Sequence, residues 1–101
     1  RSYIYVSDAV KMLINILFFG KSSLYNIGGK QKISIKSLAQ KISKTLKVKF
    51  QLPKINNNKK FGKPPRIAYV NIKKYESEFG KLKLLNIDEG LKRTIEWQKK
   101  L

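Results

Sequence analysis

The spacing of apolar residues switches along the chain between a period of two and a helical period. At the start, residues 2–6 (SYIYV) alternate, with Arg1, Tyr3 and Tyr5 on one face and Ile4 and Val6 on the other. This alternation and the β-branched and aromatic content predict a strand. Three further short runs of this composition predict strands at 24–28 (LYNIG), 48–52 (VKFQL) and 66–70 (RIAYV).

The first helical pattern follows the first predicted strand. Ser7 or Asp8 offers an N-cap, the helix runs through AVKMLINILFF, and Gly20 suits its C-terminal end. Apolar residues occupy nearly every side of this helix. A helix of this kind needs packing partners on two sides, so we expect it to be buried between two layers.

Three more helices are predicted, each with its own starting residue. Ser34 can cap the segment IKSLAQKISKTL, and Asn71 can cap IKKYESEF, which Gly80 ends. Asn86 begins the last helix, with Glu89 three residues further on as in a capping box. The alternation of strands and helices predicts an α/β fold with about four helices and short strands. Residues 54–65 carry turn residues and predict a loop.

Composition excludes several kinds of site. The 101 residues include neither cysteine nor histidine, so disulfides, thiolate metal sites and imidazole bases are impossible. The longest apolar run, MLINILFF, is far shorter than the roughly 20 residues of a membrane span. We therefore expect a cytoplasmic protein without a membrane partner.

The formal net charge is +17, and 20 of the 23 basic residues are lysines spread along the whole chain. Such a charge attracts polyanions, so a basic nucleic-acid-binding module or a lysine-rich interaction module remains an alternative reading. No aromatic RNP box or basic recognition helix supports it, and we expect no specific nucleic-acid partner. Lysine, isoleucine and asparagine fill 39 positions, as A/T-rich codons would produce. Against this background the three arginines stand out.

The order of several short motifs resembles a known family over nearly the whole chain. RSYIYVSDAV is followed by YNIGGKQKISIKSLAQKI, then by PPRIAYVNIKKYESEFG and NIDEGLKRTIEWQ. Together they are similar to the C-terminal part of extended short-chain dehydrogenases/reductases, the NAD-dependent epimerase/dehydratase family that acts on nucleotide sugars.

The resemblance implies that the chain is the C-terminal fragment of a Rossmann-type enzyme. Residues 1–29 would be a strand-helix-strand segment completing the dinucleotide-binding domain, and residues 30–101 a small substrate-binding domain. NAD(P) would bind the complete protein and not this fragment, since the glycine pair Gly28–Gly29 lacks the phosphate-binding spacing. The family's Tyr-x-x-x-Lys pair has one match, Tyr69 and Lys73, which we interpret as coincidence, so no catalytic residue is assigned.

The resemblance also implies substrate-binding residues. Arg1 and Arg66 match family arginines that reach the nucleoside diphosphate, and Asn26 matches an asparagine near the nucleotide. Asn26 can equally be a turn residue, and Arg93 is better explained by an ion pair with Glu89. The expected partners are a nucleoside-diphosphate sugar, the missing N-terminal Rossmann domain, and a second copy through homodimerisation or other self-association. Whether the reaction is an epimerisation, dehydration, decarboxylation or reduction stays open.

Overall fold

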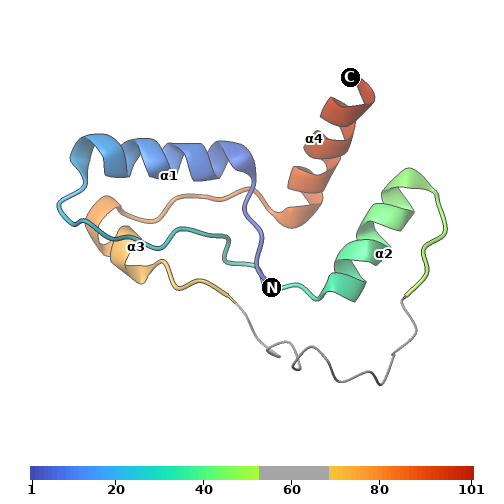
Figure 1. The fold of residues 1–101 in the computed structure, drawn as a ribbon, viewed down its shortest axis with the longest axis horizontal. Coiled ribbons are helices and arrows are strands. Elements are labelled where there is room, and N and C mark those ends of the chain that lie inside the picture. Colours follow the sequence, from blue (N-terminus) through green and yellow to red (C-terminus); the bar gives the residue numbers. More distant parts are fainter. Residues whose placement is uncertain (53–68) are drawn as a thin grey trace, which may run out of the picture.

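Four helices and the extended segments between them make up the described part of the chain. The computed structural model describes residues 1–52 and 69–101. The helices are α1 (Val6–Phe19), α2 (Ile35–Leu46), α3 (Lys73–Phe79) and α4 (Ile87–Lys99) (Figure 1). The predicted loop at 54–65 lies outside the described residues.

The predicted strands are wrong for the residues that the structure describes. Segments 2–6, 24–28, 48–52 and 69–70 form no strand there, and a single antiparallel bridge joins Ser2 to Lys32. An extended segment becomes a strand only when a neighbour takes up its backbone hydrogen bonds. Most of these segments lack such a neighbour, so the α/β prediction is confirmed in its helices alone and no Rossmann sheet is seen in these two ranges.

Helix α1 begins earlier than predicted. Its N-cap is Tyr5 rather than Ser7 or Asp8, and the Tyr5 carbonyl accepts from the backbone N–H groups of Asp8 and Ala9 at 3.0 and 3.1 Å. The Asp8 carboxylate is used elsewhere, because it accepts the backbone N–H of Leu85 at 2.8 Å. The predicted end at Gly20 is confirmed, where the Gly20 N–H bonds to the Ile16 carbonyl.

The caps predicted for the other helices are largely confirmed. The Ser34 hydroxyl accepts from the Ser37 N–H at 3.0 Å, and Asn86 Oδ1 accepts from the Glu89 N–H at 2.9 Å. Asn71 Oδ1 accepts from the Lys73 N–H at 2.9 Å, although Ile72 is the formal N-cap of α3. Gly80 ends α3 with a φ of 87°, a left-handed conformation that favours glycine.

A small core joins α1 to α3. Met12, Ile72 and Tyr75 are buried, and Tyr75 is completely so. The partly buried residues around them come from the connecting segments as well as from the two helices: Ile4, Ile16, Ile27, Phe79 and Leu82. The Tyr75 hydroxyl accepts from Asn15 Nδ2 at 2.9 Å. This bond accounts for the asparagine that interrupts the apolar run of α1.

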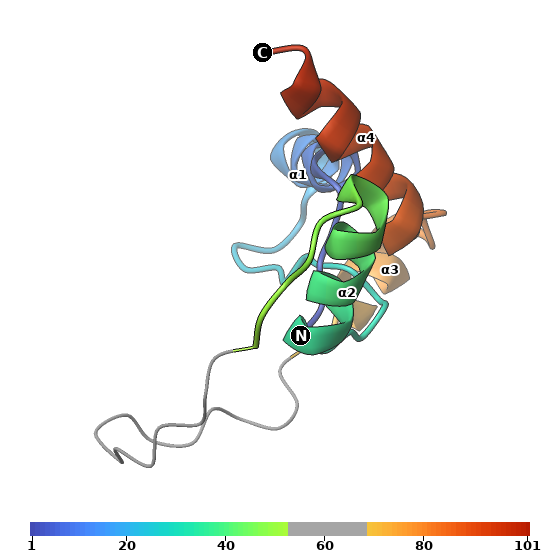
Figure 2. The ribbon, with the colours of Figure 1, turned by 90° about the vertical axis from the view of Figure 1, so that its right-hand side faces the viewer.

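Helices α2 and α4 form a second pair beside the α1–α3 pair. They contact each other, and Lys41 forms an ion pair with Asp88 at 2.6 Å. Figure 2 shows both in front of α1 when the molecule is turned by 90°.

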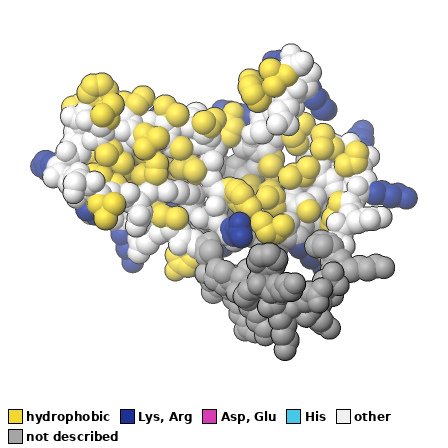
Figure 3. All heavy atoms as spheres, viewed as in Figure 1, with side chains coloured by type: hydrophobic (Ala, Val, Ile, Leu, Met, Phe, Trp, Pro, Cys, Tyr) yellow, Lys and Arg dark blue, Asp and Glu magenta, His cyan; other side chains and the backbone are white. Residues whose placement is uncertain are grey.

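One face of α1 is left uncovered. Val6, Val10, Leu13 and Leu17 recur at intervals of four, three and four residues, and each is exposed, Leu17 to 76%. Figure 3 shows apolar side chains gathered over the part of the molecule that carries α1. The expectation that this helix packs between two layers is therefore met on one side only.

Candidate functional site

The candidate site is built where three extended segments converge, at residues 1–5, 26–33 and 69–72. The Arg1 backbone nitrogen donates to the Ile33 carbonyl at 2.9 Å, and the Ile33 N–H donates to the Arg1 carbonyl at 2.8 Å. Together with the bridge between Ser2 and Lys32, these bonds fix the first segment beside the second.

The glycine pair brings these segments close together. A Cβ on Gly29 would lie 1.7 Å from the Tyr3 carbonyl oxygen, and one on Gly28 would lie 3.1 Å from Val70 Cβ. Any side chain at Gly29 would force the segments apart. The glycine pair of YNIGG therefore serves close packing of the backbone.

Arg1 borders a shallow hollow at this junction. The hollow is lined by Arg1, Ser2, Tyr69 and Val70. Arg1 and Tyr69 are both exposed, so a ligand in the hollow can reach the guanidinium group and the face of the tyrosine ring. A guanidinium group presents paired N–H donors that suit phosphate oxygens.

A second hollow adjoins the first and shares Tyr69 and Val70 with it. We call it the lysine hollow; it is lined by Gly29, Lys30, Lys32, Tyr69, Val70, Asn71, Ile72, Lys73, Glu76 and Lys81. Lys32 Nζ lies 3.9 Å from the centroid of the Tyr69 ring, a cation–π contact. Lys30 forms an ion pair with Glu76 at 2.5 Å. The surface around Tyr69 is thus strongly basic.

The predicted site residues are not all brought together. Arg1 lies at the junction, whereas Asn26 is exposed and lines neither the Arg1 hollow nor the lysine hollow. Arg66 lies outside the described residues. Lys30 and Lys32 could not be recognised as binding residues from the sequence, because two more lysines in a lysine-rich chain carry little signal. Tyr69 stands out in the sequence only through its Tyr-x-x-x-Lys match.

Hydrogen bonds of Tyr25, Glu78 and Lys74 fix the segment that leads to Asn26, and we call this group of residues the clamp. The Tyr25 hydroxyl donates to Glu78 at 2.5 Å and accepts from the backbone N–H groups of Lys21 and Ser22. Lys74 Nζ donates to the Ser22 hydroxyl and to the Leu24 carbonyl. The segment after α1 is thereby fixed against α3.

The clamp shifts the ionisation of its two acidic groups. The hydrogen bond from Tyr25, and then that from the Lys21 N–H, lowers the pKa of the Glu78 carboxyl group. Partial burial and the bond to Glu78 raise the pKa of Tyr25. Both shifts favour a charged carboxylate accepting from a neutral phenol.

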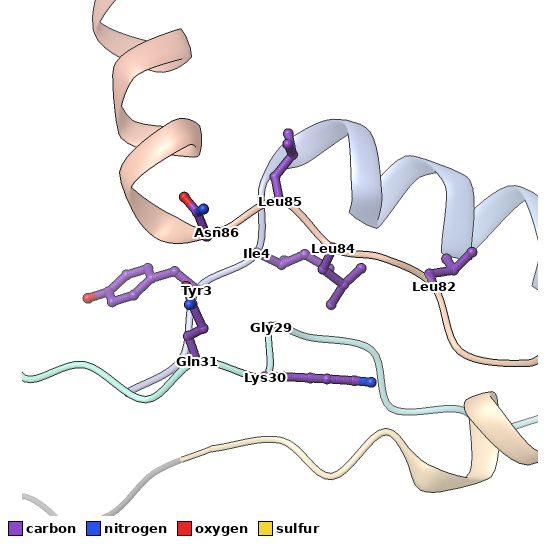
Figure 4. A pocket seen from close by; sticks show the side chains of 9 residues that line it. All are labelled: Tyr3, Ile4, Gly29, Lys30, Gln31, Leu82, Leu84, Leu85 and Asn86. Atoms are coloured by element: carbon purple, nitrogen blue, oxygen red, sulfur yellow. The ribbon is translucent and has the colours of Figure 1, made fainter.

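A third hollow shares Gly29 and Lys30 with the lysine hollow. Its volume is about 150 Å³, and it is bordered by residues 3–4, 29–31, 82 and 84–86. Figure 4 shows Tyr3 and Ile4 pointing in opposite directions along the first segment, with Ile4 beside Leu84. For this pair of residues the predicted alternation is therefore present without a strand.

The Tyr-x-x-x-Lys match spans the start of α3. Tyr69 precedes α3 and Lys73 is the first residue of that helix, so this Tyr-x-x-x-Lys match does not lie on one helix. In the two described ranges there is no group of three carboxylates that could hold a metal ion.

No helix in these ranges is long and apolar enough to cross a membrane.

Comparison of the chain with protein-family models, with curated proteins and with solved structures finds no match. The proposed relation to nucleotide-sugar enzymes therefore depends on the motifs quoted above and on the chemistry of the site.

Proposed function

We propose that this chain is the substrate-binding C-terminal part of an NAD(P)-dependent nucleotide-sugar epimerase or dehydratase. The observation that carries the proposal is the position of Arg1, which borders a hollow with Tyr69 and Val70 next to the lysine hollow. The family motifs assign a diphosphate contact to this arginine.

The chemistry of the hollow suits a nucleoside diphosphate. A diphosphate carries at least two negative charges, which need charged donors of fixed geometry. The Arg1 main chain is fixed by its two bonds to Ile33, so its side chain starts from a defined position. In this proposal the chain binds and orients the substrate.

Cofactor binding is not assigned to these residues. The glycine pair does not fit a cofactor phosphate, because the Tyr3 carbonyl and Val70 occupy the space above it. When NAD(P) is bound to the complete protein it supplies hydride transfer, and another part of that protein would hold it.

The coding sequence upstream of Arg1 tests the proposal. We expect a glycine-rich strand-turn-helix and a helical Tyr-x-x-x-Lys within roughly 200 residues, the span of a dinucleotide-binding domain. An upstream region without these two motifs would contradict the proposal.

A second test is enzymatic. Residues 1–101 alone should show no turnover of a nucleotide sugar with or without added NAD, because the groups that hold nicotinamide against the sugar would be missing. NADH formation by purified residues 1–101 would contradict the proposal that these residues bind the substrate while another part of the protein holds the cofactor.

The net charge of +17 supports a second candidate, a basic nucleic-acid-binding module. A dedicated module should bind duplex DNA with micromolar or better affinity at about 150 mM salt, whereas a diffuse lysine coat should bind weakly and without saturation. We expect the second result.

A further inference from the structure

We infer that the lysine hollow binds a carboxylate on the sugar ring, so that the substrate is the nucleoside diphosphate of an acidic sugar. The inference rests on the proposed function and specifies the substrate class. Its basis is that the Arg1 hollow and the lysine hollow share Tyr69 and Val70.

The first step is that the two hollows adjoin each other. The bridge from Ser2 to Lys32 places the Arg1 segment directly beside the segment that carries Lys32. A ligand whose diphosphate contacts Arg1 can therefore extend across Tyr69 into the lysine hollow. Tyr69 is 55% exposed, and Lys32 Nζ lies 3.9 Å from the centroid of its ring, so a ligand that crosses Tyr69 passes beside this ammonium group.

The second step is the charge of the hollow. Four of its ten lining residues are lysines, compared with 20 of 101 residues in the chain, so lysine is about twice as frequent here as on average. The one carboxylate is that of Glu76, which Lys30 pairs. Lys32, Lys73 and Lys81 remain as positive charges without a carboxylate partner among the described residues.

The third step is the chemistry of the ligand. Like charges that share a hollow repel each other, and an anion placed among them removes that cost. The hydroxyl groups of a neutral sugar can accept hydrogen bonds from an ammonium group, but they leave its positive charge unbalanced. A sugar whose CH₂OH group is replaced by a carboxylate supplies the missing negative charge on the side of the ring away from the diphosphate.

The test compares two ligands that differ only in this group. UDP-glucose and UDP-glucuronate are titrated by calorimetry into the protein as it is encoded, with whatever precedes Arg1. We expect UDP-glucuronate to bind about tenfold more tightly, a preference of the size that one charge-assisted contact provides.

Variants of the lysines test whether the preference for UDP-glucuronate arises in the lysine hollow. Lys32→Gln combined with Lys73→Gln should reduce the preference to less than about twofold, and any loss of affinity for the diphosphate should be the same for both ligands. Lys92→Gln on α4 is the control, since Lys92 is exposed and lines neither hollow, and it should keep the full preference.

Each other outcome overturns the inference in a recognisable way. Equal affinity for the two ligands, or a preference that survives in the double variant, contradicts the inference and leaves the proposed function standing. If neither this pair of ligands nor the corresponding pairs with other nucleosides bind, the proposed function fails with it. If 1 mM inorganic phosphate abolishes the preference, the lysine hollow is a general anion site and the assignment to a sugar carboxylate is wrong.

Discussion

Gly29 occupies a position where the backbone of Tyr3 leaves no room for a side chain. An alanine Cβ there would lie 1.7 Å from the Tyr3 carbonyl oxygen, so Gly29→Ala must separate the two segments. We expect a loss of about 2 kcal/mol or more in the free energy of unfolding, measured by denaturant titration, because backbone atoms cannot yield as a flexible side chain can.

Gly90 on α4 provides the control for this substitution. A Cβ at Gly90 would meet the Tyr5 ring at 3.5 Å, an ordinary contact. Since alanine is a better helix former than glycine, Gly90→Ala should stabilise the protein by up to about 1 kcal/mol. A similar loss in both variants would show that the Gly29 contact has no special role.

Glu78 makes stability depend on pH. Its pKa is lowered in the folded protein by the Tyr25 hydrogen bond, so the unfolded state binds the proton more readily. The ionised Glu78 carboxylate stabilises the folded protein above pH 4.5, the ordinary pKa of glutamate. This stabilisation is lost as the pH falls from 4.5 through the lower pKa that Glu78 has in the folded protein. The unfolding midpoint should fall more steeply below pH 4.5 in the wild type than in Glu78→Gln; identical profiles would contradict this role of the clamp.

Single residues could be predicted where their partners are local. The Glu89–Arg93 pair, four residues apart on α4, is confirmed at 3.0 Å. The roles of Asp8 and Glu78 could not be predicted, because their partners Leu85 and Tyr25 lie far away in the sequence. The same limit applies to Lys32 and Tyr69, which meet only after three segments converge.

At the scale of elements, the bond between Asn15 and Tyr75 fixes α1 against α3. Asn15→Leu should reduce the free energy of unfolding by about 1–3 kcal/mol, because the fully buried Tyr75 hydroxyl would lose its partner. Adding Tyr75→Phe to Asn15→Leu should recover part of that loss. If the double variant is no more stable than Asn15→Leu, the bond is not the reason for the asparagine in this helix.

Helices could be predicted from the sequence and strands could not, for a physical reason. A helix satisfies its backbone hydrogen bonds within its own segment, and the caps at Ser34 and Asn86 mark where α2 and α4 begin. A strand depends on a neighbour that local sequence does not specify. The segment 24–28 has a strand-like composition, yet in the described ranges it has no ladder to join.

At the scale of the whole molecule, the uncovered face of α1 predicts association. Its exposed Val6, Val10, Leu13 and Leu17 form an apolar stripe of the kind that soluble monomers rarely leave open. Residues 1–101 should therefore self-associate in sedimentation velocity. Leu13→Lys with Leu17→Lys should restore a monomer of unchanged helix content, since both side chains are already exposed. A monodisperse wild-type monomer would contradict the prediction.

The most direct test of the proposed function is calorimetric titration of arginine variants with a nucleoside-diphosphate sugar, in the protein as it is encoded. Arg1→Ala and Arg66→Ala should each weaken binding by about 2–4 kcal/mol, because a bound diphosphate loses a charge-assisted donor. Arg93→Ala, which breaks an exposed ion pair, should leave the affinity unchanged and alter stability by less than about 1 kcal/mol. Weaker binding in Arg93→Ala together with normal binding in the Arg1 and Arg66 variants would contradict the proposed site.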